Sequence, residues 1–176
     1  MEVKRILAAI DLSPHAREVL ILAGELAHTM RSRLIIGNVI NQRDIDTVQS
    51  VLKPSQGHYA SPYSATYFSV DTHVENVKQD RTGRIKTLIR EAGVDDLPVD
   101  IAFTIGHPFE ELIRMVNDRA IDLVVMGSKG QTDHPHTILG TTAEKMFRHC
   151  PVPVLSVRDE HFPELEKRRN LFAFSS

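Results

Sequence analysis

Residues 123–130 read Leu-Val-Val-Met-Gly-Ser-Lys-Gly, residues 140–147 read Gly-Thr-Thr-Ala-Glu-Lys-Met-Phe, and residues 151–157 read Pro-Val-Pro-Val-Leu-Ser-Val. This stretch decides the fold. Its first four residues form an unbroken apolar run, which is typical of a strand covered on both faces. A loop bounded by glycines, a helix start and a second apolar strand follow. The order predicts two buried strands joined through a loop and a helix.

The loop after residue 126 has features of an anion-binding site. Gly127 and Gly130 lack a Cβ, so the backbone between them can adopt left-handed conformations and let a ligand approach its N–H groups. Gly140 repeats this feature directly before the helix, where Thr141 and Glu144 have the T-x-x-E spacing of a capping box. The N-terminus of a helix attracts phosphate groups. From these residues alone, a phosphate site and a tight structural turn are both open interpretations.

The remaining chain alternates predicted strands with predicted helices, which indicates an α/β domain with a parallel sheet. A Ser-Pro pair at residues 13–14 predicts the start of the first helix. The alternating pattern of residues 99–103 suits a strand at the edge of the sheet. Residues 41–70 have no sustained period and predict a long irregular loop. The predicted strands are residues 6–10, 34–40, 99–103, 123–126 and 152–157, and the predicted helices are about 13–31, 71–91, 108–116 and 141–148.

The pattern Gly127-x-x-Gly130, nine residues, Gly140-Thr141 resembles the nucleotide-binding signature of the universal stress protein (UspA-like) family, in its ATP-binding branch. The resemblance implies a Rossmann-like, doubly wound five-stranded parallel sheet with strand order 3-2-1-4-5, as in adenine nucleotide alpha hydrolase-like folds. It implies a domain over residues 1–157, followed by a tail at 158–176. It also implies a homodimer that pairs through the strand from Val152 to Val157.

In this strand order the winding reverses between the first and fourth strands, which opens a crevice at their carboxyl ends. The resemblance implies that backbone N–H groups from Gly130 to Thr142 hold phosphates, that Gly127 lies beside the ribose and that Val39 meets the adenine edge. Lys129 is either a counter-charge for phosphate or a solvated side chain. The candidate nucleotide-binding residues are Ala9, Ile10, Asp11, Val39, Met126, Gly127, Lys129, Gly130, Gly140, Thr141 and Thr142.

The resemblance implies ATP as the cofactor, and Mg²⁺ is a candidate ion beside it, because hard cations prefer carboxylate and phosphate oxygens. Asp11 either contacts the nucleotide or its metal ion, or only begins the turn ahead of Ser13. His134-Pro135-His136 has too few supporting ligands for a metal site, so a solvated loop tip is favoured. These histidines could also touch the terminal phosphates.

Composition limits the class of protein. Charged residues make up 25% and apolar residues 41% of the 176 residues, and the formal net charge is −2. This balance gives no indication of nucleic acid as a partner. There is no apolar run of membrane-spanning length and no signal-peptide pattern, so we expect a cytoplasmic protein. The single cysteine, Cys150, is expected to be a buried core residue.

The function expected from the resemblance is that of an ATP-binding regulatory protein, acting as a homodimer in a stress or energy response. A weak ATPase or nucleotidyl transferase of related fold is one alternative. A protein-interaction module that binds no nucleotide is the other. The sequence has no paired carboxylates, no Ser-His-Asp constellation and no arginine cluster, so no catalytic residue is assigned and at most slow hydrolysis is expected.

Overall fold

The computed structural model describes residues 2–52, 70–130 and 139–158. Its five strands form one parallel sheet in the order β3-β2-β1-β4-β5, which confirms the predicted strand order and fold. The strands are β1 (Arg5–Ala9), β2 (Arg33–Asn41), β3 (Val99–Gly106), β4 (Leu123–Gly127) and β5 (Val154–Val157). The helices are α1 (Ala16–Met30), α2 (Gln42–Leu52), α3 (Val70–Glu91), α4 (Pro108–Asp118) and α5 (Thr141–His149).

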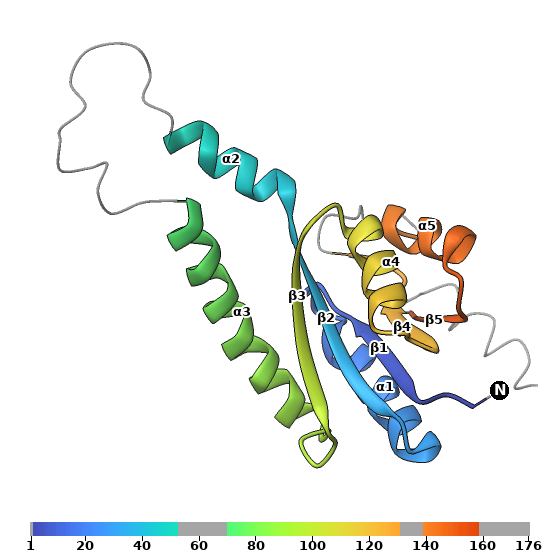
Figure 1. Cartoon of the computed structure of the whole chain (residues 1–176). Helices are drawn as coiled ribbons and strands as arrows, with labels where there is room; N and C mark the ends of the chain where they lie inside the picture. The colour runs from blue at the N-terminus through green and yellow to red at the C-terminus, as the bar shows by residue number, and fades with distance from the viewer. Residues whose placement is uncertain (1, 53–69, 131–138, 159–176) are drawn as a thin grey trace, which may run out of the picture.

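Helices cover the sheet on both faces (Figure 1). Ile6 and Ala8 of β1 pack on one face with α1 and with Ile85 of α3, whereas Leu7 between them packs on the other face with α4 and α5. Alternate residues of each central strand therefore enter two different cores. This explains why the central strands are continuous apolar runs rather than alternating ones. β3, predicted as an edge strand, lies at one edge of the sheet, and β5 lies at the other.

The turn between β1 and α1 differs from the prediction. The helix begins at Ala16 rather than at the Ser-Pro pair, and His15 is the residue that precedes its first turn. The reason is a local turn, in which the Ser13 N–H donates to Asp11 Oδ1 at 3.0 Å and the Ala16 N–H donates to the Ser13 carbonyl at 3.0 Å. This turn uses the residues that would otherwise begin the helix.

The prediction of an irregular loop over residues 41–70 was wrong for its first part, which is helix α2. Figure 1 shows α2 continuing directly from the end of β2. Ile45, Val48 and Leu52 recur at the spacing of one helix face, and Ile45 is buried, so the sequence did contain a helical pattern here that the prediction overlooked. Residues 53–69 lie outside the described residues, as do His134, His136 and the tail from residue 159.

Two smaller expectations can be compared with the structure. Cys150 is half-buried at the end of α5 rather than fully buried, because only one side of it packs against the α4–α5 core. Burial nevertheless raises the pKa of its thiol. Among the described helices, none is long and apolar enough to cross a membrane.

Candidate functional site

A cleft of about 620 Å³ opens at the carboxyl ends of β1, β2 and β4. The first turns of α4 and α5 form its other walls. This is the position at which the direction of winding reverses in the sheet. The structure brings all the candidate residues from the sequence to the walls of this one cleft: Ala9, Ile10, Asp11, Val39, Met126, Gly127, Lys129, Gly130, Gly140, Thr141 and Thr142.

The β1 end of the cleft is a strained turn. Leu12 has a φ of 62°, which is uncommon for a residue with a side chain. Two bonds hold the turn, from the Ser13 N–H to Asp11 Oδ1 at 3.0 Å and from Arg84 Nη2 of α3 to the Leu12 carbonyl at 3.3 Å. Asp11 therefore begins the turn and also lines the cleft. The structure is compatible with a role in the turn alone and with contact to a nucleotide or its metal ion. Strain of this kind is often found at functional sites.

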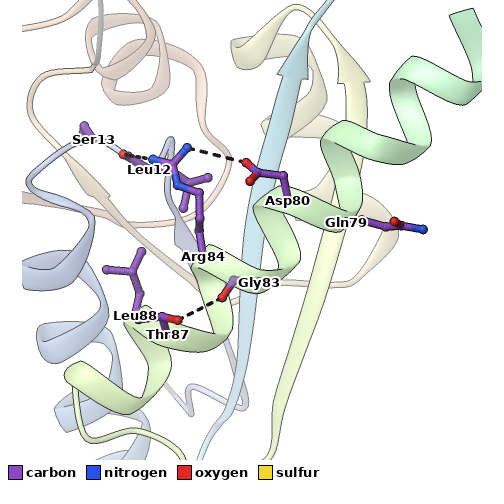
Figure 2. A pocket seen from close by; sticks show the side chains of 8 residues that line it. All are labelled: Leu12, Ser13, Gln79, Asp80, Gly83, Arg84, Thr87 and Leu88. Atoms are coloured by element: carbon purple, nitrogen blue, oxygen red, sulfur yellow. Dashed lines mark hydrogen bonds and ion pairs between the residues drawn. The ribbon is translucent and has the colours of Figure 1, made fainter. Parts of the chain in front are cut away.

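Behind this turn lies a second hollow of about 510 Å³, between α3 and residues 12–13 (Figure 2). Arg84 spans it, with its guanidinium 3.3 Å from the Leu12 carbonyl and 4.0 Å from the Asp80 carboxylate. Thr87 Oγ1 donates to the carbonyl of Gly83 at 3.2 Å. None of the candidate nucleotide-binding residues lines this hollow, so its contribution is to fix the turn against α3.

The β2 end of the cleft is held by a buried polar pair that sequence reasoning missed. Asn38 is fully buried, and its Nδ2 donates to the Ile10 carbonyl at 2.8 Å. Arg81 of α3 donates from Nη1 to Asn38 Oδ1 at 2.8 Å and to the Val39 carbonyl at 3.1 Å. One asparagine and one arginine thus join β1, β2 and α3 at the cleft wall. No pattern in the sequence links residues 38 and 81.

Arg81 is a partly desolvated cation on the wall of the cleft. Desolvation lowers its pKa, the nearby charges of Asp44, Asp80 and Asp11 act in the opposite direction, and Arg84 adds to the lowering. A guanidinium keeps its proton in proteins even so. Arg81 therefore contributes a fixed positive charge to the cleft.

The β4 end of the cleft is a close-packed loop. A Cβ on Gly127 would lie 3.0 Å from the carbonyl oxygen of Lys129, so this position favours glycine. The Gly140 N–H donates to the Ser128 carbonyl at 2.8 Å, which closes the loop directly before α5. Gly140 itself has φ −70° and ψ 154°, so its backbone is extended rather than left-handed.

The capping box predicted at Thr141 was wrong. Gly140 is the N-cap of α5, and no side chain among the described residues caps this helix. Glu144 instead forms an ion pair with Arg148 at 2.8 Å, while its N–H bonds to the Gly140 carbonyl at 2.9 Å. The first N–H groups of a helix have no partner within the helix. At α5 they therefore face the cleft without a capping side chain, which suits an anion better than the predicted box would.

The charged residues of the cleft come from six different segments. The cations are Arg43, Arg81, Lys129 and Lys145, and the carboxylates are Asp11, Asp44 and Glu110. The sequence predicted only Asp11 and Lys129 of these. Lys145 could have been inferred from its position one turn after Thr141 on α5, since residues four apart share a helix face. The others reach the cleft only through tertiary packing.

The residues present fit a nucleotide better than a metal ion held by the protein alone. The fit to phosphate rests on the uncapped start of α5 and on Gly127, where a Cβ would contact the loop backbone. The described part of the chain contains no group of three or more histidine, cysteine or carboxylate side chains that could hold a metal ion. A Mg²⁺ ion here would therefore need phosphate oxygens in addition to a carboxylate such as Asp11.

The chain was compared with known proteins. The family model described as the universal stress protein family matches residues 2–158. The stress response protein NhaX of Bacillus subtilis is 26% identical over 88% of this chain and 97% of its own length. The solved structure of protein MJ0577 has a TM-score of 0.69 at 21% identity, covering 92% of this chain and 99% of that one.

Two further structural neighbours were solved with nucleotides. One is a universal stress protein in complex with cAMP, with a TM-score of 0.56 and 16% identity over 90% of this chain and 98% of that one. The other is a universal stress protein family protein from Arabidopsis thaliana with AMP bound, with a TM-score of 0.55 and 13% identity over 91% of this chain and 94% of that one. At these identities the likeness concerns the fold. The matched residues include every strand of the sheet and the whole wall of the cleft, and on this basis the chain belongs to the universal stress protein family.

Proposed function

We propose that this protein binds an adenine nucleotide, ATP, in the cleft at the ends of β1, β2 and β4, and acts as a regulatory protein rather than as an enzyme. The observation that carries the proposal is the convergence of all the candidate residues on one cleft whose α5 wall has no capping side chain. In this arrangement the N–H groups of Gly130, Thr141 and Thr142 hold the phosphates, while the Gly140 N–H, bonded to the Ser128 carbonyl, fixes the loop beside them.

The charge of the cleft supports an anionic ligand. Its four cations outnumber its three carboxylates, although the whole chain has a net charge of −2. The helices α2, α4 and α5 all begin at its walls, at Gln42, Pro108 and Thr141. Each helix N-terminus adds partial positive charge. Two neighbours of the same fold were solved with cAMP and with AMP, which agrees with a nucleotide as the ligand.

The base and ribose lie, in this proposal, between the β1 and β2 ends. This part of the cleft is lined by Val39, Ala9, Ile10, Asp11 and Met126. Bound ATP supplies phosphate oxygens, which together with Asp11 would hold Mg²⁺. The residues of this chain bind and orient the nucleotide, and no group is assigned to its hydrolysis.

The homodimer belongs to the same proposal. β5 forms an edge of the sheet, and its backbone groups on the outer side are available to a second copy of the strand. Phe147 of α5, a helix that contacts β5, has 46% of its surface exposed and is an apolar side chain that a second copy could cover. Light scattering at micromolar protein concentration is expected to give the mass of a dimer, and a monomer mass would remove this part of the proposal.

Calorimetric titration with ATP tests the nucleotide site. One sample of the purified protein is heat-denatured, and its supernatant is analysed for adenine nucleotide that co-purified. ATP is titrated into a second sample of native protein. Wild type is then compared with Gly130→Val, in which a branched side chain blocks the approach of phosphates to the loop. The matched control is Gly83→Val, since a Cβ at Gly83 meets nothing within 4 Å.

We expect Gly83→Val to bind ATP like wild type and Gly130→Val to bind it at least about tenfold more weakly, the equivalent of one lost charge-assisted contact. Equal affinity in all three proteins would reject the phosphate loop. Turnover of ATP, measured against an Asp11→Asn variant and a mock preparation, tests the alternative of a weak ATPase. Turnover abolished by Asp11→Asn would favour that alternative.

A further inference from the structure

Lys145 is a cation of the cleft that the candidate nucleotide-binding residues do not include. It lies on α5, one turn after Thr141, on the helix face that lines the cleft. Its Nζ is 5.9 Å from the ring centroid of Phe109 in the first turn of α4. The side chain of Lys145 therefore spans from α5 toward α4 across one end of the cleft.

Lys145 differs in its pairing from the other cation on the same helix. Arg148 is paired with Glu144 at 2.8 Å. Among the described residues no carboxylate lies within 4.0 Å of Lys145 Nζ, and the Glu110 side chain, which lines the same cleft, is beyond that distance. Lys145 thus directs into the cleft an ammonium group that has no carboxylate partner in the described part of the chain.

The surroundings of Lys145 make this arrangement unfavourable in the absence of an anion. α5 begins one turn before it, and no side chain caps that helix. α4, which carries Phe109, begins at Pro108 and has no side-chain cap either. Both helix starts carry partial positive charge, which repels a nearby cation. Of the carboxylates in their first turns, Glu111 is paired with Arg114 and Glu144 with Arg148, so Glu110 remains to offset part of this charge. A ligand with negative charge at this end of the cleft would relieve the repulsion from both helices and pair with the ammonium group.

The position of Lys145 relative to the phosphate amides indicates which charge it meets. In the proposed site, a single phosphate is already bound by the N–H groups of Gly130, Thr141 and Thr142, at the loop and the helix start. Lys145 lies a further helical turn along the cleft wall, toward Phe109. A second or third phosphate of a longer chain would extend past the first binding position and come within reach of its flexible side chain.

We propose that Lys145 binds the phosphates beyond the first one and so makes the cleft selective for nucleoside di- and triphosphates over monophosphates. This inference rests on the proposed function, because it assigns the phosphate-chain length that the same cleft recognises. Phe109 acts as a positioning residue, since its ring holds the ammonium group over the cleft. Lys145 contacts the ligand and takes no part in chemical steps.

The test compares the affinities of ATP and AMP, measured by calorimetry in buffer with a chelator so that no metal ion screens the phosphates. The variant is Lys145→Gln, and the matched control is Arg148→Gln, which removes the same charge from the same helix at a residue that does not line the cleft. A Lys145→Arg variant restores the charge. Because both nucleotides are measured on each variant, a general loss of folding lowers both affinities and leaves their ratio unchanged.

We expect Lys145→Gln to weaken ATP binding about five- to tenfold, as for one charge-assisted contact, while AMP affinity stays within about twofold. Arg148→Gln should leave the ratio of ATP to AMP affinity unchanged, and Lys145→Arg should restore most of it. An unchanged ratio in Lys145→Gln, or an equal fall in Arg148→Gln, would overturn the role of Lys145 while leaving the nucleotide site intact. Wild-type protein that binds neither AMP nor ATP would overturn the nucleotide site and this inference together.

Discussion

Replacing Asn38 by leucine tests the polar pair that joins β1, β2 and α3. The substitution keeps a side chain of similar length but removes the donor to the Ile10 carbonyl and the acceptor for Arg81, each in a bond of 2.8 Å. Asn38 is fully buried, so the Ile10 carbonyl loses its partner away from water, which costs about 1–3 kcal/mol. The bond from Arg81 contributes about 1 kcal/mol more, because the guanidinium is only half-buried and keeps its bond to the Val39 carbonyl.

The expected loss of unfolding free energy is therefore about 2–4 kcal/mol, a substantial part of the stability of an ordinary domain. For a chain of this length it corresponds to a fall in Tm of roughly 4–16 °C. Urea titration followed by circular dichroism measures the first value and a thermal scan the second. Asn76→Leu is the control, because Asn76 is exposed on α3 and its replacement is expected to change stability by less than about 0.5 kcal/mol. Equal stability of the two variants would refute the reasoning.

Three further measurements follow from the structure. Gly83→Ala should stabilise the protein by about 0.5–1 kcal/mol in urea titrations, because Gly83 lies inside α3 where a Cβ meets nothing, and a destabilised variant would contradict this. Asp122→Asn should lose stability at neutral pH: hydrogen bonds from the Lys4 and Arg5 N–H groups lower the pKa of Asp122, so its stabilising contribution is present above the ordinary aspartate pKa and lost as the pH falls below about 4. The stability difference between wild type and variant should therefore shrink on acidification, and a constant difference would argue against the charge. The thiol of Cys150 should react with iodoacetamide more slowly than free cysteine at pH 8, because burial raises its pKa, and reaction at the rate of free cysteine would show that the thiol is not shielded.

Several features of the fold could be predicted because they depend on local pattern. The central strands are buried on both faces, so each gives a continuous apolar run that needs no knowledge of its neighbours. β3 alternates because it lies at the edge, as its sequence predicted. The order of the strands came from the resemblance to a family, and the observed sheet confirms it.

Other features could not be predicted because their signals are weak or mislead. The apolar face of α2 is short, with Ile45, Val48 and Leu52 at helical spacing, so its signal was overlooked beside the irregular residues that follow it in the sequence. Thr141 and Glu144 have the spacing of a capping box, but the Glu144 carboxylate forms an ion pair with Arg148, four residues later, instead of bonding to the start of the helix. A spacing rule describes what a pair of residues can do, whereas the neighbours decide which bond forms.

The sequence by itself determined the alternation of strands and helices, the glycine-bounded loop and the residues that end the strands at one edge of the sheet. These properties follow from apolar periodicity and from the absence of side chains at particular glycines. Only the tertiary structure decided which distant charges share the cleft with them. Arg81 meets Asn38 across 43 residues of chain, and Lys145 meets Phe109 across two helices. Electrostatic contacts of this kind depend on distances in space, which the order of residues along the chain does not contain.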